Sequence, residues 1–137
     1  PEKMMGFDPD WFIEKKLAKT KQGLSFFDKE ALAEYKRCFR NPDTIHAICE
    51  DYRAGAGIDL DHDEKDFKAG HKIECPVLLV WGATGGVGRN HNPGPADIWK
   101  AYAANIVDAI AVPSGHYLMD EAPQETTAAL HKFFVAP

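Results

Sequence analysis

The chain has 137 residues, of which 45% are hydrophobic and 27% charged, the composition of about one ordinary globular domain. Sixteen lysines and arginines against 21 aspartates and glutamates give a net charge of -5, so the sequence lacks the basic balance that DNA, RNA and anionic membranes attract. The longest apolar run, at residues 76–81, is far shorter than the roughly 20 residues that cross a bilayer. These features argue against nucleic acid and membrane partners and favour a soluble, cytoplasmic protein.

The three cysteines, Cys38, Cys49 and Cys75, form neither an even set nor a CxxC pair. The sequence therefore indicates neither a disulfide framework nor a zinc finger. We expect all three to behave as small buried hydrophobic residues.

Residues 7–73 have a helical pattern with polar joints between the helices. Leu32, Tyr35 and Phe39 recur at helical spacing behind Asp28, a residue type that favours the N-cap position. This pattern predicts one amphipathic helix that begins next to Asp28.

A second helix is predicted to begin with Asn41 as N-cap and Pro42 at its first position, and to end at Gly55. One face of this helix collects the residues Ile45, Ile48, Cys49 and Tyr52. The highly charged residues 59–72 favour a third, solvated helix that Gly70 closes.

The pattern changes from helical to alternating strand and helix after Glu74. Apolar residues 77–81 suit a parallel strand that is buried on both faces, and residues 106–112 predict a second strand. A glycine-rich loop and a helix are expected between the strands, the helix with Ile98, Trp99, Tyr102 and Ala103. Pro123 is expected to open a final helix whose packed face consists of Ala129, Leu130, Phe133 and Phe134. The fold class is therefore α/β, with a parallel pair of strands joined by a crossover.

Two parallel strands do not form a sheet that can stand alone, because a bare pair exposes long unpaired edges. We therefore expect a helical segment, residues 1–72, followed by the last part of a larger α/β domain, residues 73–137. The chain also begins with Pro1 rather than an initiator methionine. We expect it to be a fragment of a longer protein.

The glycine-rich run from Gly82 to Gly88 is similar to the dinucleotide-binding loop of dehydrogenases. That function requires a helix that begins inside the motif, and residues 89–95, with two prolines and a glycine, do not continue one. The acidic residue expected at the end of the second strand is also missing. The sequence therefore favours a plain loop without a bound cofactor.

Ser114, Gly115, His116 and Tyr117 follow directly on the second predicted strand. In open parallel sheets, catalytic groups lie just beyond the carboxyl ends of the strands. An imidazole at this place is suited to act as a general base. The alternative is that His116 merely caps a turn.

Three segments together resemble the end of an α/β-hydrolase: residues 76–82, the Gly115-His116 pair, and residues 120–123 before the closing helix. Within that superfamily, residues 39–54, with Cys49-Glu50-Asp51-Tyr52-Arg53-Ala54 among them, resemble the haloacetate (fluoroacetate) dehalogenases, with epoxide hydrolases as near relatives. The resemblance implies that residues 1–72 are a helical cap segment. Residues 73–137 would be the C-terminal part of the core, with its last two strands and the histidine loop.

The same resemblance implies a site and a reaction. In those dehalogenases an aspartate displaces halide from carbon, and a histidine then activates the water that opens the resulting ester. His116 matches this base, and Tyr52 matches a cap tyrosine that donates a hydrogen bond to the halide. Neither a metal nor an organic cofactor is implied. From its spacing alone, Tyr52 is a core residue of the second helix.

The family's nucleophile is missing from these residues, since no Gly-x-Asp-x-Gly, Gly-x-Ser-x-Gly or Asp-Arg-Gly element occurs. We therefore expect the chain alone to be inactive. Its expected partners are a small haloacid and the N-terminal half of the fold or a complementing chain, with a homodimer as an alternative. Two other functions remain open: an epoxide hydrolase of the same fold, and a non-catalytic module that needs a partner chain.

Overall fold

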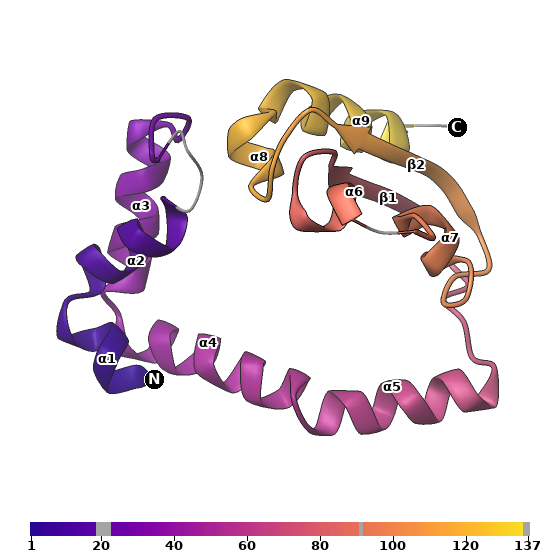
Figure 1. Ribbon diagram of the computed structural model, residues 1–137, viewed down its shortest axis with the longest axis horizontal. Helices are drawn as coiled ribbons and strands as arrows, with labels where there is room; N and C mark the ends of the chain where they lie inside the picture. Colours follow the sequence, from indigo (N-terminus) through magenta and orange to yellow (C-terminus); the bar gives the residue numbers. More distant parts are fainter. Residues whose placement is uncertain (19–22, 91, 136–137) are drawn as a thin grey trace. The chain divides into compact units, whose positions relative to one another are not determined.

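The computed structural model describes residues 1–18, 23–90 and 92–135 (Figure 1). The chain forms two compact units, residues 1–64 and 65–137. The boundary lies inside helix α5 (Ile58–Ala69), whereas the sequence placed it between residues 72 and 73. The aromatic ring of Phe67, near the end of α5, packs 5.5 Å from that of Tyr102, which ties the end of this helix to the second unit.

The first unit is helical, as predicted. Besides the start of α5, it contains α1 (Glu2–Phe7), α2 (Pro9–Leu17), α3 (Lys29–Phe39) and α4 (Pro42–Gly55). The carboxylate of Asp28 accepts the backbone N–H groups of Glu30 and Ala31 at 2.9 and 3.0 Å, which starts α3. The Asn41 side chain accepts the N–H of Asp43 at 3.0 Å and starts α4. Both predicted helix starts are therefore confirmed.

A small apolar core joins the four helices of the first unit. Its buried members, Phe39, Ile45 and Cys49, are covered by the partly buried side chains of Met5, Phe12, Ile13 and Ile48. The rings of Phe12 and Phe39 stack with centroids 5.8 Å apart. Ion pairs at the surface, Arg40 with Asp10 at 2.7 Å and Arg53 with Glu2 at 2.6 Å, connect the same helices.

The expectation for the cysteines is wrong at two positions. Cys49 is buried in this core, whereas Cys38 and Cys75 are exposed. Cys38 lies on the outer side of α3, where its thiol is 3.5 Å from a carboxylate oxygen of Glu34. Cys75 lies in the exposed segment that precedes the first strand.

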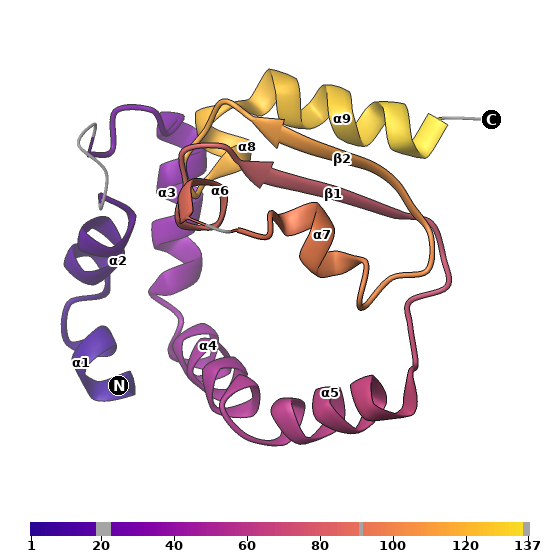
Figure 2. The ribbon, with the colours of Figure 1, turned by 45° about the vertical axis from the view of Figure 1, so that its right-hand side comes forward.

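The second unit contains the two parallel strands β1 (Val77–Gly82) and β2 (Ile106–Val112), within one residue of the predicted ranges (Figure 2). Their pairing sets Val80 opposite Ile110, and a parallel bridge between Ile73 and Ala103 precedes it. Helix α9 (Pro123–Val135) lies along both strands. Within the described residues β1 pairs with β2 alone, so its other edge carries no strand.

The connections between the strands differ from the prediction in two places. The expected plain loop contains the one-turn helix α6 (Gly86–Asn90), and the next helix, α7 (Pro95–Trp99), ends before Tyr102 and Ala103. The backbone turns after Trp99, because the N–H groups of Tyr102 and Ala103 both donate to its carbonyl at 3.0 and 2.9 Å. Ala103 thereby reaches the parallel bridge that precedes β2.

Helix α9 packs with half of the predicted residues, Ala129 and Phe133, and with Thr126 in place of the others. Thr126 and Ala129 are buried and Phe133 is partly buried, whereas Leu130 and Phe134 are 42% and 76% exposed. The contacting residues follow the spacing i, i+3 and i+7, which leaves the neighbouring apolar positions outside the interface. An ion pair of Lys132 with Asp108 on β2, at 2.8 Å, also holds the helix to the sheet.

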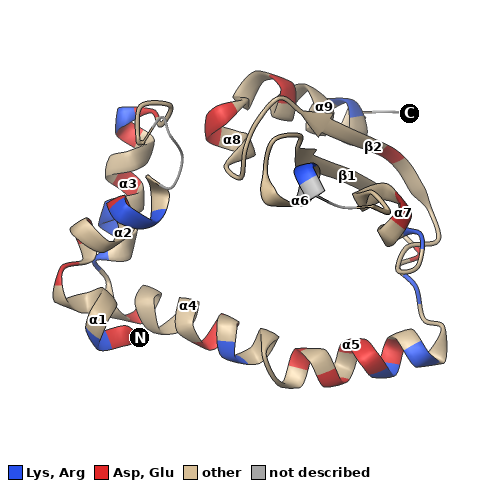
Figure 3. Cartoon of the chain, viewed as in Figure 1, with Lys and Arg blue, Asp and Glu red and all other residues tan. Residues whose placement is uncertain are grey.

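Helix α5 has the solvated character that its sequence predicts. None of its residues is buried, and acidic side chains are spread along it with lysines between them (Figure 3). Gly70 follows it with a positive φ of 74°, a conformation that favours glycine. Of the helices that the structure describes, none is both long and apolar enough to span a membrane.

Candidate active site

The histidine loop, residues 113–117, runs from the end of β2 to the short helix α8 (Leu118–Glu121). His116 is exposed, and its ring lies 5.0 Å from the ring of Tyr117 in an edge-to-face arrangement. The loop therefore presents an accessible imidazole just beyond the carboxyl end of a parallel strand, where the sequence predicted it.

The end of β1 holds the first half of this loop. Both the backbone N–H and the hydroxyl of Thr84 donate to the carbonyl oxygen of Ser114, at 3.0 and 2.8 Å. The N–H of Ala83 donates to the carbonyl of Val112 at 2.9 Å. The contact between the two backbones is so close that a β-carbon on Gly82 would lie 1.7 Å from the carbonyl oxygen of Gly115.

The same close packing explains the glycine-rich run that resembles a dinucleotide-binding loop. A β-carbon on Gly88 would lie 2.3 Å from the carbonyl oxygen of Gly82, so this glycine too is required by a neighbouring backbone. A helix does begin inside the motif, but α6 is only five residues long. Close backbone contacts therefore account for Gly82 and Gly88, whereas Gly86 has open space at its β-carbon position.

A cavity of about 580 Å³ lies along β1 and reaches the histidine loop. Its lining includes every residue of β1 together with Trp99, His116 and Leu118. Successive residues of a strand point to opposite faces, so a cavity that touches all of them follows the strand's edge. It coincides with the edge of β1 that carries no strand in the described residues.

Tyr52 lies on α4 in the first unit and is 68% exposed. Ile45 and Cys49, on the stripe where the spacing placed Tyr52, are buried, but Tyr52 itself is not part of this core. Its hydroxyl is therefore accessible to a ligand. His116 and Tyr52 belong to different units of the chain.

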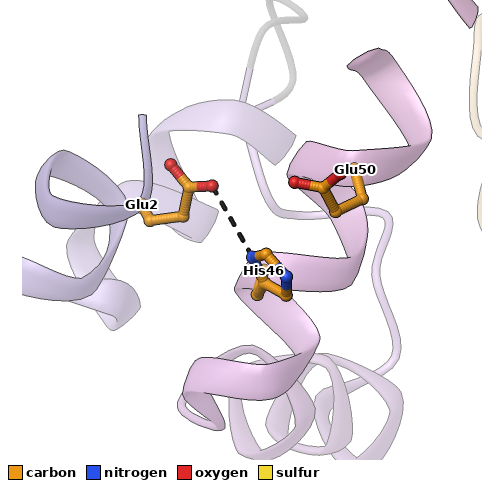
Figure 4. Close-up of side chains that lie close together, drawn as sticks. All are labelled: Glu2, His46 and Glu50. Atoms are coloured by element: carbon orange, nitrogen blue, oxygen red, sulfur yellow. Dashed lines mark ion pairs between the residues drawn. The ribbon is translucent and has the colours of Figure 1, made fainter. Parts of the chain in front are cut away.

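A cluster of potential metal ligands joins α1 and α4. One ligand atom each from Glu2, His46 and Glu50 lies within 4.8 Å of the others, and Figure 4 shows the three side chains facing one another. The Arg53 guanidinium already pairs with both carboxylates, at 2.6 Å from Glu2 and in closer contact with Glu50. A backbone hydrogen bond and this guanidinium lower the pKa of Glu2 to about 2. The Arg53 guanidinium therefore already neutralises the two carboxylates that a metal ion would need as ligands, so the geometry does not favour a metal.

The role of Glu121 beside the histidine loop, and the burial of Ser114 within it, were not predicted from the sequence. Glu121 accepts the backbone N–H groups of Gly115 at 2.7 Å and Tyr117 at 3.0 Å with its two carboxylate oxygens. Ser114 is 3% exposed, and its hydroxyl has no hydrogen-bond partner among the described residues. Glu121 is an acidic residue in the first turn of α8, but it binds N–H groups four and six residues before it, whereas the capping box pairs residues three apart, so no local pattern pointed to it.

No protein-family model matches the chain. In sequence, the chain is 37% identical over 135 residues to fluoroacetate dehalogenase of Burkholderia sp., covering 97% of this chain and 42% of that enzyme. It is 32% identical over 108 residues to soluble epoxide hydrolase of Corynebacterium sp. (strain C12), covering 79% of this chain and 35% of the relative.

In structure, the chain resembles an α/β hydrolase from Nostoc sp. PCC 7120 with a TM-score of 0.87 and 44% sequence identity. The match covers all of this chain and 45% of that one, so the chain spans less than half the length of the relatives it matches. These similarities confirm both the fold class and the resemblance that the sequence indicated. The chain is thus a C-terminal part of an α/β hydrolase, related in sequence to fluoroacetate dehalogenase.

Proposed function

We propose that this chain supplies the general base of a hydrolase of the haloacetate dehalogenase type. The reaction is the cleavage of the carbon–halogen bond of a small 2-haloacid to a hydroxy acid and a halide ion. The observation that carries the proposal is the 37% identity to fluoroacetate dehalogenase over almost the whole chain. The exposed imidazole of His116, just beyond the end of β2, supports it.

The proposed reaction has two covalent steps. An aspartate from outside these 137 residues attacks the carbon that bears the halogen, so that a carbon–oxygen ester bond forms as halide leaves. His116 then takes a proton from water, whose oxygen attacks the ester carbonyl and releases the hydroxy acid and the free aspartate. The exposed hydroxyl of Tyr52 donates a hydrogen bond to the halide, where negative charge develops. No metal or organic cofactor takes part in these steps.

The proposed partner of the second unit is a further parallel strand from the N-terminal part of the fold. Such a strand would cover the edge of β1 that carries no strand and fill the cavity along it. The two relatives are each more than twice as long as this chain, so they contain further residues that can form such a strand. The strand would belong to the same polypeptide or to a complementing chain; pairing of two copies of this chain is the alternative.

An epoxide hydrolase is the second candidate, supported by the 32% identity to the Corynebacterium enzyme. In this case Tyr52 would donate its hydrogen bond to the epoxide oxygen, and His116 would keep its role. The two candidates differ in the product, since only the dehalogenase releases halide.

The proposal can be tested with a chimera in which this chain replaces the matching 135 residues of the Burkholderia enzyme. We expect halide release from fluoroacetate or chloroacetate. His116→Ala should release one halide per protein and then stop, with turnover lowered roughly 10²- to 10⁴-fold, because the ester forms but is not opened. Tyr52→Phe should lower turnover roughly 100-fold. His131→Ala, which changes an exposed histidine of α9, is the matched control.

Each result of this experiment has a defined meaning. Full turnover in His116→Ala would refute the role of this histidine. A folded chimera, verified by circular dichroism, that opens epoxides without releasing halide would establish the second candidate. A folded chimera that turns over neither substrate would leave the non-catalytic module as the function.

A further inference from the structure

We propose that Glu121 is a positioning residue that fixes the backbone on both sides of His116. Its role in the reaction rests on the function proposed above, whereas its role in holding the loop does not. Glu121 lies at the end of α8, five residues after the histidine.

The two oxygens of the Glu121 carboxylate bind two different peptide groups. Oε2 accepts the N–H of Gly115 at 2.7 Å, and Oε1 accepts the N–H of Tyr117 at 3.0 Å. His116 is the residue between these two. Hydrogen bonds to an ionised acceptor are shorter and stronger than neutral ones, so a single side chain restrains the backbone that enters and leaves the histidine.

The carboxylate also lies close against the loop. A β-carbon on Gly115 would lie 2.8 and 2.9 Å from its two oxygens, so a side chain at this position would displace the carboxylate. On its other side, the loop is held by the two bonds from Thr84 to the carbonyl of Ser114. The histidine loop is thus held from β1 on one side and from α8 on the other.

The placement of the imidazole follows from that of its backbone. The ring of His116 packs against the ring of Tyr117, whose own N–H is bound by Glu121. A general base must lie within hydrogen-bond reach of the water that it deprotonates, and a displacement of about 1 Å can lower a rate 100-fold. A carboxylate that fixes the residues before and after the base therefore contributes to kcat without contacting the substrate.

A simple capping role for Glu121 would give a different pattern. Tyr117 is the N-cap residue of α8, and a carboxylate near that end stabilises a helix through its charge alone. Capping does not require the second bond, to Gly115, which lies two residues before the cap. The bond to Gly115 is thus the feature that separates positioning from capping.

Nuclear magnetic resonance of the folded chimera described above tests the contact directly. In Glu121→Gln, we expect the amide protons of Gly115 and Tyr117 to move upfield and to exchange with solvent roughly tenfold faster, because a charged acceptor becomes neutral. Glu125→Gln makes the same chemical change on the exposed side of α9 and should leave both amides unchanged. Unchanged Gly115 and Tyr117 amides in Glu121→Gln would overturn the proposal.

Kinetics of the chimera separate positioning from stability. Glu121→Gln should lower kcat for halide release about tenfold with an unchanged KM. Thr126→Val removes the bond from the Thr126 hydroxyl to the carbonyl of Leu118, at 3.1 Å, and serves as a destabilised control that should keep kcat. An equal loss of kcat in both variants, or none in Glu121→Gln, would refute positioning. If every form of the chimera lacks activity, the proposed reaction is wrong, and the amide protons still decide whether Glu121 holds the loop.

Discussion

Gly82 and Gly115 are in direct backbone contact, such that a β-carbon on Gly82 would lie 1.7 Å from the carbonyl oxygen of Gly115. Gly82 ends β1, and Gly115 precedes His116. The position of the histidine loop therefore depends on the absence of a side chain at the end of the neighbouring strand.

This contact predicts that Gly82→Ala destabilises the second unit. The added methyl group meets backbone atoms that cannot rotate away, and overpacking of this kind costs typically about 1–3 kcal/mol in the free energy of unfolding. Gly86→Ala is the matched control, because no atom lies within 4 Å of its β-carbon position. Urea denaturation of both variants measures the difference, and equal stability would contradict the close contact.

In contrast to Gly82→Ala, substitution of the buried Ser114 by alanine is predicted not to destabilise the second unit. The Ser114 hydroxyl has no hydrogen-bond partner among the described residues. Ser114→Ala therefore removes a buried polar group without breaking a hydrogen bond to any of these residues. We expect the free energy of unfolding to stay unchanged or to rise by about 1 kcal/mol. Thr126→Val, whose hydroxyl does have a partner, should lose about 1 kcal/mol in the same measurement. A large loss in Ser114→Ala would show that its hydroxyl is bound.

The exposure of the cysteines predicts two classes of thiol. Cys38 and Cys75 should react quickly with a thiol reagent in the folded chain, and the buried Cys49 should react only as the first unit unfolds. Mass spectrometry of the labelled peptides identifies the protected site. In Cys49→Ser the slow phase should vanish, and rapid labelling of Cys49 in the native chain would contradict the core of the first unit.

The ion pair between α1 and α4 predicts how the first unit responds to acid. A backbone hydrogen bond and the Arg53 side chain hold the pKa of Glu2 at about 2, below its ordinary value of 4.5. A lowered pKa means that the stabilisation is fully present above pH 4.5 and is lost as the pH falls towards 2. Glu2→Gln should therefore flatten the pH dependence of stability in this range.

Asp51→Asn, at an exposed acidic residue of α4, is the control for this titration and should retain the wild-type slope. Chemical unfolding at a series of pH values gives both slopes. The same slope in Glu2→Gln as in the unchanged chain would show that this carboxylate does not contribute.

The sequence predicted those elements whose signals are local. The N-caps Asp28 and Asn41 and the first-turn Pro42 act within a few residues of themselves, and both helices begin where these residues indicate. The strands were found because their apolar runs are short and bounded by proline, glycine or charged residues. His116 was placed correctly at the end of β2 for the same reason.

The features that the sequence did not predict depend on distant neighbours. Leu130 and Phe134 have the periodicity of a packed face, but periodicity does not say which apolar positions the sheet will cover. Gly82 closely contacts the backbone of Gly115, 33 positions later, which no local pattern in the glycine-rich run indicates. Glu121 binds N–H groups four and six residues before it, a spacing that the common capping patterns do not include.

The strandless edge of β1 also affects how the isolated polypeptide behaves at high concentration. No strand of the described residues pairs with the N–H and C=O groups of this edge, so other extended segments can add to it, and Trp81 beside the cavity adds an apolar surface that attracts apolar sequences. Purification of these 137 residues alone will therefore favour aggregation that increases with protein concentration, and a lysine substituted for a residue of this edge is the simplest way to keep the polypeptide monomeric.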